Sequence, residues 1–299
     1  MYNYGKQIIT ESLNTLKVEN YRKREAYVNK LLDYYNGNNT NYYIENRFDL
    51  DAFREVPAYQ ANITKKFINK MSRIYTVGAD RNVSKKYDTI SVLKDAKMKH
   101  IERMTRLIGT IAVRVMFIDD EMPHFDYQPI YYFQPFFGSD PFKPVAISYP
   151  LMHYTDDTTN TDKCQYIHWN AESYTIFDES GKILEEKEHG YGSLPFAFTH
   201  REHQSDSFYV EGANDICSAN EHINITMTEM QLGLRFQMFG QPVVSGADLG
   251  NNQRFGSDVI LELPDGANYD IKSPSGDINK VIENVKFQME LVAQNNHLS

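Results

Sequence analysis

The side chains best suited to chemistry lie in one stretch near the middle of the chain. Within sixteen residues the sequence places His153, Asp156, Asp157, Cys164 and His168. Their spacing matches no established pattern of metal ligands, and the stretch has the composition of a loop rich in threonine and aspartate before a strand. We therefore expect no metal site here.

The sequence contains none of the short motifs that accompany phosphate binding or common hydrolytic chemistry. A Walker A loop, the dinucleotide-binding GxGxxG, HExxH, the GxSxG elbow and paired CxxC are all absent from it. Glu185, Glu186 and Glu188 surround a lysine, which is typical of a solvated face rather than of a catalytic carboxylate pair. We expect a protein with no catalytic residues and no cofactor.

The bulk composition is that of an ordinary globular protein, long enough for one large or two modest domains. The 299 residues are 41% hydrophobic and 13% aromatic, and the formal charge is −9. A surface that wraps DNA tightly would be basic, so the charge argues against a static nucleic-acid binder. Cys164 and Cys217 have no CxxC spacing and indicate reduced, structural thiols. With no signal peptide and no apolar run of ~20 residues, we expect a soluble, cytoplasmic protein.

The N-terminal part is expected to be helical, and the middle of the chain to be rich in strands. Apolar periodicity predicts helices over residues 6–36, from Ile63 to Tyr75, and over about 90–106. Arg22, Lys23 and Arg24 are interpreted as a solvated face, with a phosphate contact as the alternative. From Leu107 on, β-branched residues predict strands, including 165–169, 173–177 and 182–186 with a hairpin turn at Ser180-Gly181.

The C-terminal third predicts a long helix, a small β module and a second helix. The first helix begins near residue 213 and ends at Gly240, where Pro242 blocks its continuation. It carries two apolar stripes, which indicates burial on two sides, either inside one chain or against a neighbouring subunit. Gly233 indicates a close helix approach or a bend. Strands are expected at 259–263 and 269–272, and Asp277 can cap a helix with one apolar stripe that begins at Ile278 and ends at Val292.

The order of four loose motifs resembles that of bacteriophage portal proteins, the head-to-tail connectors of tailed phages. The motifs span residues 53–81, 109–151, 174–202 and 211–246, and they read FREVPAYQANITKKFINKMSRIYTVGADR, GTIAVRVMFIDDEMPHFDYQPIYYFQPFFGSDPFKPVAISYPL, YTIFDESGKILEEKEHGYGSLPFAFTHRE and EGANDICSANEHINITMTEMQLGLRFQMFGQPVVSG. The resemblance implies an α+β fold with a wing over residues 1–213, a first stem helix over 214–240, a clip over 241–276 and a second stem helix over 277–299. Portals usually continue into a tunnel loop, a kinked helix and a crown, and this sequence stops where those would begin.

The resemblance also implies a function and a set of partners. A homo-oligomeric ring, commonly of twelve subunits, would sit at one capsid vertex of the virion after assembly in the host cytoplasm. Double-stranded DNA would pass through it non-specifically during packaging and ejection. The ring would dock the terminase large subunit and later a head-tail adaptor or tail protein, and would contact the major capsid or scaffolding protein. It would have no membrane partner.

Three groups of residues are candidates for these roles. Those expected at the subunit interface on the first stem helix are Met227, Met230, Leu234, Met238, Phe236 and Phe239. Those expected to dock partners on the clip are Arg254, Asp258, Glu262, Asp265 and Lys272. Lys280 and Lys286 would face the channel, or would simply be solvated lysines of an amphipathic helix.

Two other classes of function stay open at this point. One is a virion scaffold or head-tail adaptor that binds proteins and conducts no DNA, which predicts a monomer or small oligomer without a central channel. The other is a hydrolase with an unrecognised site, which predicts a concave cluster of histidines or carboxylates within residues 120–200.

Overall fold

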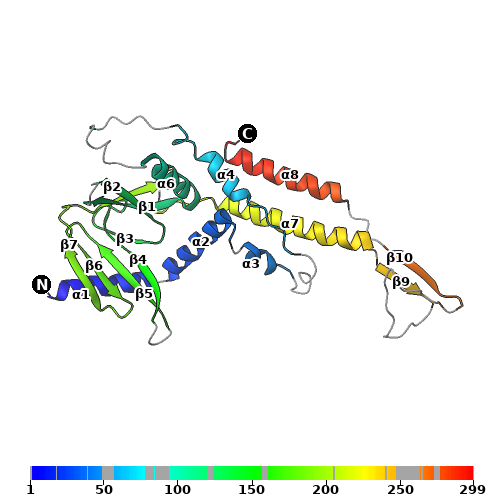
Figure 1. Ribbon diagram of the computed structural model, residues 1–299, viewed down its shortest axis with the longest axis horizontal. Coiled ribbons are helices and arrows are strands. Elements are labelled where there is room, and N and C mark those ends of the chain that lie inside the picture. Colours follow the sequence, from blue (N-terminus) through cyan, green and yellow to red (C-terminus); the bar gives the residue numbers. More distant parts are fainter. Residues whose placement is uncertain are drawn as a thin grey trace. The chain divides into compact units, whose positions relative to one another are not determined.

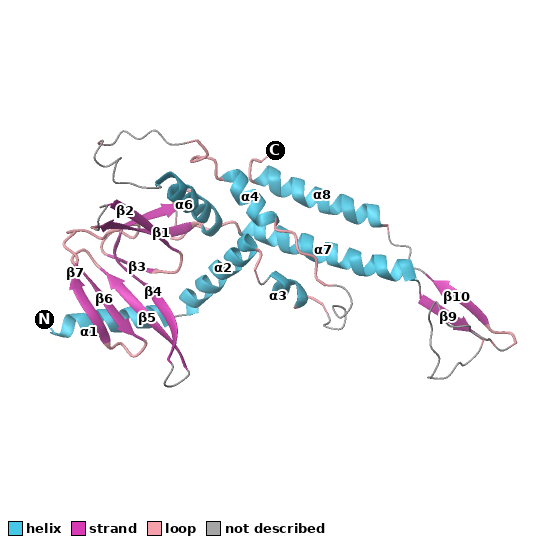
Figure 2. Ribbon diagram, in the orientation of Figure 1, coloured by secondary structure: helices cyan, strands magenta, loops and turns pink. Residues whose placement is uncertain are grey.

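A computed structural model of the protein gives the course of most of the chain (Figures 1 and 2). It describes residues 2–17, 19–38, 40–48, 57–77, 84, 94–119, 124–156, 161–204, 206–239, 241–246, 263, 265–272 and 277–298. Within these, residues 2–8, 17, 19–20, 152–156, 161–163, 236–239 and 241–242 are described by their backbone alone. The fold is α+β, with helices and several antiparallel sheets.

The chain divides into two compact units. The first comprises residues 1–38 and 62–217, and the second comprises residues 39–61 and 218–299. The assignment of a wing, stem and clip stays a prediction. None of the described helices combines the length and the hydrophobicity that a bilayer crossing requires.

In the part of the chain that the structure describes, four helices lie within the first unit. They are α1 (Tyr2–Lys17), α2 (Glu19–Asn36), α4 (Ile63–Met71) and α6 (Lys94–Ile108). The single helix expected over residues 6–36 is therefore two. The helix expected to reach Tyr75 ends at Met71, because the backbone of Ser72 leaves the helical range with a ψ of 83°. The Ser72 N–H and hydroxyl both donate to the Ile68 carbonyl in the last turn. Ile74 lies outside α4 and is 66% exposed.

The described strands of this unit form two antiparallel sheets. The first has the order β2-β1-β8, from β1 (Thr110–Ile118), β2 (His124–Ile130) and β8 (Phe196–His200). The second has the order β3-β4-β5-β6-β7. Its strands are β3 (Gln134–Phe137), β4 (Pro144–Asp156), β5 (Thr161–Trp169), β6 (Ser173–Asp178) and β7 (Ile183–Glu188).

The predicted strands at 165–169, 173–177 and 182–186 are confirmed as β5, β6 and β7. The turn at Ser180-Gly181 is confirmed too, with Gly181 at a φ of 81° that suits glycine. Leu107 and Ile108 were expected in a strand, but they form the last turn of α6. They are fully buried there, and the helix ends at Gly109, whose N–H donates to the Thr105 carbonyl.

Aromatic and aliphatic side chains from both sheets form the core of the first unit. Phe133, Ile147 and Trp169 are at most 1% exposed, and they pack in one cluster with Phe208 from the segment before α7. A second cluster places Ile9 and Leu13 of α1 against Phe177 of β6. The apolar face of α1 therefore covers the second sheet (Figure 1).

Two glycines permit a crossing of backbone on backbone at the end of α6. A Cβ on Gly109 would lie 2.1 Å from the Val210 carbonyl oxygen, and a Cβ on Gly212 would lie 2.1 Å from the Leu107 carbonyl oxygen. Across the same crossing, the Ala213 N–H donates to the Leu107 carbonyl at 2.8 Å. This hydrogen bond lies directly before the first residue of α7 (Asn214–Phe239).

The second unit contains α3 (Thr40–Glu45), most of α7, the strands β9 (Gln241–Ser245) and β10 (Asn268–Lys272), and α8 (Ile278–Asn295). The helix predicted over about 213–240, the strand at 269–272 and the final helix are all confirmed by these bounds. The strand predicted at 259–263 lies almost wholly outside the described residues.

Candidate assembly interface on the helices α7 and α8

One face of α7 is polar, and its side chains form hydrogen bonds with the backbone of another segment of the second unit. Asn220, Asn224 and Thr228 recur every four residues, and none is more than 1% exposed. The Asn224 Oδ1 accepts from the Ala61 N–H at 2.9 Å, and the Asn220 Nδ2 donates to the Ala61 carbonyl at 2.8 Å. The Thr228 hydroxyl accepts from the Tyr59 N–H at 2.9 Å. This ladder supplies the hydrogen bonds that the irregular segment 57–61 lacks.

The first half of α7 thus packs against other segments of its own chain. Next to the ladder, Glu221 is 7% exposed and its Oε1 accepts from the Arg47 Nη2 at 3.5 Å. The ladder was not predicted from the sequence, although Asn, Asn and Thr recur there at a four-residue interval. Such a row on an otherwise apolar helix is a usable signal for a buried polar contact.

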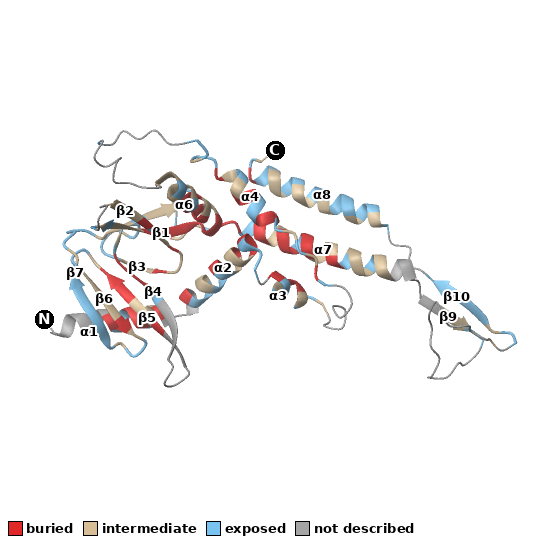
Figure 3. Cartoon of the chain, in the orientation of Figure 1, coloured by how far each residue is buried: buried red, intermediate tan, exposed pale blue. Residues whose placement is uncertain are grey.

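The burial of α7 decreases along the helix (Figure 3). Ile223 is 2% exposed, whereas Met227, Met230 and Leu234 are only half-buried in the single chain. These three are among the predicted interface residues. The other three, Phe236, Met238 and Phe239, lie on α7, but their side chains are outside the description. The second half of α7 therefore leaves apolar surface available to a partner.

Gly233 is exposed, and a Cβ added to it would meet no atom within 4 Å. Within the described residues the predicted close helix approach is therefore absent at Gly233. The helix is continuous from Asn214 to Phe239. The glycine instead borders an open groove of about 440 Å³ between α7 and α8, lined by Met230 and Leu234 on one side and Ile278 and Val281 on the other.

The helix α8 begins as the sequence predicts. The Asp277 carboxylate accepts from the Asn279 N–H at 3.1 Å and from the Lys280 N–H at 3.4 Å, which caps the first turn. No side chain among the described residues of α8 is buried. The predicted stripe, which includes Val281, Val285 and Val292, is only half-buried.

A second apolar pair lies on α8, away from that stripe. Phe287 is 63% exposed and Leu291 is 45% exposed. Residues four apart share one face of a helix, so the two side chains form a common patch. This pair was not predicted from the sequence, because the prediction of one amphipathic stripe leaves out apolar residues on the other side of the helix. α8 is therefore apolar on two faces in a unit that covers neither fully.

The two-stranded sheet β9-β10 exposes apolar side chains as well. Its antiparallel register pairs Tyr269 with Val244 and Ile271 with Pro242. Tyr269 is 40% exposed and Ile271 is 56% exposed. Such a ribbon is marginal alone and gains stability from further strands or a packed partner.

The charged candidates are solvated where the structure describes them. Asp265 and Lys272 are exposed in the turn before β10 and at its end, while Arg254, Asp258 and Glu262 lie outside the described residues. Lys286 is exposed. The Lys280 Nζ lies 3.5 Å from the Asp277 Oδ2, with 80% of the lysine side chain exposed. Among the four that the structure describes, no shared site is formed.

Of the residues singled out for chemistry, the side chains of His153, Asp156 and Asp157 lie outside the described residues, and those that are described form no open site. His168 and the hydroxyls of Ser12 and Ser148 contact one another, with Ser148 Oγ at 2.8 Å and Ser12 Oγ at 3.2 Å from the His168 Nδ1. All three are at most 5% exposed, and burial lowers the pKa of His168 to about 4. Within the part of the chain that is described, no three His, Cys, Asp or Glu side chains are placed to hold a metal.

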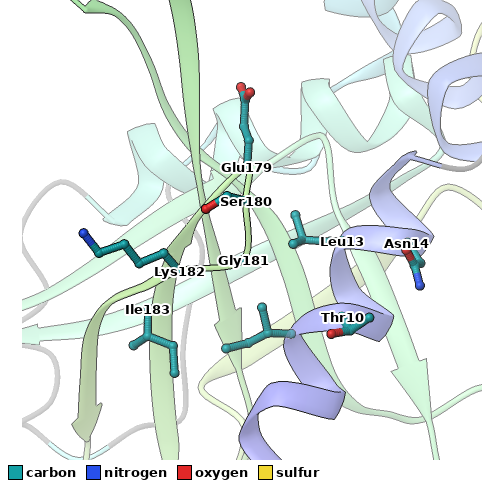
Figure 4. Close-up of a pocket in the computed structure, with 9 residues that line it drawn as sticks. Thr10, Leu13, Asn14, Glu179, Ser180, Gly181, Lys182 and Ile183 are labelled. Atoms are coloured by element: carbon teal, nitrogen blue, oxygen red, sulfur yellow. The ribbon is translucent and has the colours of Figure 1, made fainter.

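A second groove, of about 630 Å³, lies between α1 and the β6-β7 turn (Figure 4). Leu13 points toward Gly181 across it, with a Cδ1 that would lie 3.2 Å from a Cβ on that glycine. Glu179 lies at its edge, and its Oε1 accepts from the Cys164 N–H at 2.8 Å. The groove is open, and the one carboxylate among its described lining residues is hydrogen-bonded to a backbone N–H. The groove therefore has no arrangement typical of catalysis.

Comparison with solved structures finds weak structural likenesses, one of which is described here. A chain from a structure described as the neck of an empty GTA particle computed with C6 symmetry matches with a TM-score of 0.43 and 10% sequence identity. The match covers 86% of this chain and 68% of that chain. No protein-family model matches the sequence. No curated protein matches it either.

Proposed function

We propose that this protein is a portal-type head-to-tail connector that assembles into a ring. The observation that carries the proposal is the module formed by α7, the β9-β10 ribbon and α8. Its element order matches the stem helix, clip and second stem helix that the sequence motifs imply. Both helices retain apolar surface that their own unit does not cover.

The apolar surface is of the kind that a ring interface needs. A side chain such as Phe287 gains about 1.5–3 kcal/mol when it moves from water into a packed contact. Each subunit of a closed ring presents one face to the preceding copy and a different face to the next, so its helices need two apolar faces. α8 has both, in the half-buried stripe and in the Phe287–Leu291 patch.

The finer parts of the proposal follow from the motif resemblance. The ring has twelve subunits, sits at a capsid vertex of the virion and conducts double-stranded DNA without sequence preference during packaging and ejection. The clip docks the terminase large subunit and then an adaptor or tail protein. The protein supplies a channel and performs no catalysis.

The interface is tested with paired substitutions. Phe287→Ser and Leu291→Ser together remove the exposed patch of α8 and leave the buried core of the unit unchanged. The control is Tyr42→Ser on α3, which removes an apolar side chain of similar exposure, 65%. We expect the double variant to sediment as a smaller species while the control keeps the mass of the wild type. Equal masses for all three proteins would refute the assignment of this patch to the subunit interface.

A further inference from the structure

On two neighbouring helices of the first unit, most of the charged residues are basic. Residues 63–77 and 94–108 contain nine lysines and arginines and two acidic residues, in a chain whose formal charge is −9. α4 and α6, which these segments contain, contact each other, and the Ile74 N–H just beyond α4 donates to the Glu102 Oε1 at 3.3 Å. The chain therefore contains a local basic region although its formal charge as a whole is negative.

Within each helix the cations form a stripe. Lys66, Lys70 and Arg73 recur at intervals of four and three residues along α4 and the turn after it, and all three are exposed. The apolar side chains Phe67 and Ile68 occupy the buried face of the same helix. Lys66 and Lys70 are four residues apart and share one face of α4. Arg73 lies beyond the end of the helix, where its Nε donates to the Lys70 carbonyl at 2.7 Å.

α6 repeats the pattern with the same intervals. Its stripe consists of Lys99, Arg103 and Arg106, which are partly exposed, while Ile101 and Met104 are buried. Of the two acidic residues on α6, Glu102 is 8% exposed and already bonded to the Ile74 N–H, and Asp95 lies in the first turn.

Three of the stripe cations have no carboxylate partner. In the described part of the chain no carboxylate forms an ion pair with Lys66, Lys99 or Arg106, whereas Lys97, which is outside the stripes, pairs with Asp126. The Arg103 Nε is buried and has no hydrogen-bond partner among the described residues. A polyanion would supply the opposite charge that Lys66, Lys99 and Arg106 lack.

We propose that the stripes on α4 and α6 form a non-specific binding surface for the phosphate backbone of double-stranded nucleic acid. Each stripe spans about 10 Å along its helix. Each strand of a duplex carries one negative charge per ~3.4 Å of its axis, and so about three over that length, which matches the three cations of each stripe. The inference rests on these charges and does not depend on ring assembly.

The test measures binding of a fluorescein-labelled 20-base-pair duplex to the whole chain by anisotropy, between 50 and 200 mM salt. With up to six phosphates neutralised, we expect log K to fall with log salt at a slope of about −5. The triple variant Lys66→Gln, Lys99→Gln and Arg106→Gln should lower the slope magnitude by about 2.7 and lower affinity at 50 mM salt at least about tenfold.

The matched control is Lys143→Gln, Lys182→Gln and Lys187→Gln, three exposed lysines of the same unit outside the stripes. It should leave both slope and affinity unchanged. Circular dichroism checks that both variants keep the wild-type fold. Two results would overturn the inference. One is an equal loss of binding in the two triple variants, and the other is no duplex binding at 50 mM salt. So would binding of polyglutamate in place of the duplex at the same residues, which would indicate an acidic protein partner. Because the readout is binding per chain, failure of the ring would leave it intact.

Discussion

Replacement of Gly212 by alanine should destabilise the first unit strongly. The added Cβ would lie 2.1 Å from the Leu107 carbonyl oxygen and 2.7 Å and 2.9 Å from the Ile108 carbonyl carbon and oxygen. All three atoms are backbone atoms at the end of α6, so no side chain can turn away to make room. The two segments must move apart, and the hydrogen bond from the Ala213 N–H to the Leu107 carbonyl is stretched with them.

The size of the effect follows from two contributions. Overpacking of a close contact costs about 1–3 kcal/mol, and the upper end applies here because backbone must shift. Weakening one hydrogen bond adds about 0.5–1.5 kcal/mol. A loss of about 4 kcal/mol lowers the melting temperature by roughly 8–16 °C for a unit of 150–250 residues.

The assay is thermal unfolding followed by circular dichroism, with Gly233→Ala as the control. The same substitution at Gly233 meets no atom within 4 Å and lies within a helix. It should stabilise the chain by up to ~1 kcal/mol through helix propensity. A Gly212→Ala protein that melts with or above the wild type would refute the close crossing of residues 107–109 and 210–213.

The other predictions concern the second unit, the buried histidine and the β ribbon. Asn224→Ala removes both contacts to the Ala61 backbone and should cost about 1–3 kcal/mol, with faster hydrogen exchange at Ala61 as its specific mark. Because burial lowers the pKa of His168 to about 4 from an ordinary 6.5, the unfolded chain takes up the proton first as the pH falls. The stability is full above pH 6.5 and is lost between 6.5 and 4, by about 2 kcal/mol from pH 7 to pH 5, and His168→Gln should flatten this dependence in urea unfolding. The amides of β9 and β10 should exchange rapidly in a monomer and slowly in an assembled ring.

Local signals in the sequence predicted the elements near them well. Asp277 caps α8 as expected, and the Ser180-Gly181 turn lies between β6 and β7 as expected. Pro242 follows the end of α7 within three residues. In each case the deciding interactions are made within a few residues along the chain, where the residue type alone specifies the conformation.

Contacts between distant segments were not predictable in this way. The Ala61 backbone is satisfied by Asn224, which is 163 residues away, and no local pattern announces that pairing. Arg24 was interpreted as part of a solvated face. Its Nη2 instead donates to the Thr110 carbonyl at 3.1 Å, and its guanidinium lies 3.6 Å from the centre of the Tyr209 ring. An arginine stem packs readily on aromatic surface, which periodicity does not reveal.

The candidate interface was predicted in part. The apolar residues of α7 were named from their spacing, and three of them are half-buried in the single chain. Phe287 and Leu291 were not named, because one chain gives no reason for a second apolar face on α8. The structure shows that this second face is exposed to solvent in the second unit, which is the observation that the sequence lacks.

The most direct test of the proposed function is the mass and shape of the wild-type protein in solution. Light scattering on a sizing column gives the mass, and negative-stain images of the same peak give the shape. A portal-type ring predicts particles of about 416 kDa, twelve copies of the 34.7 kDa chain, with an axial hole. A homogeneous 34.7 kDa monomer at every protein concentration would contradict the proposal that α7 and α8 form a subunit interface in this chain.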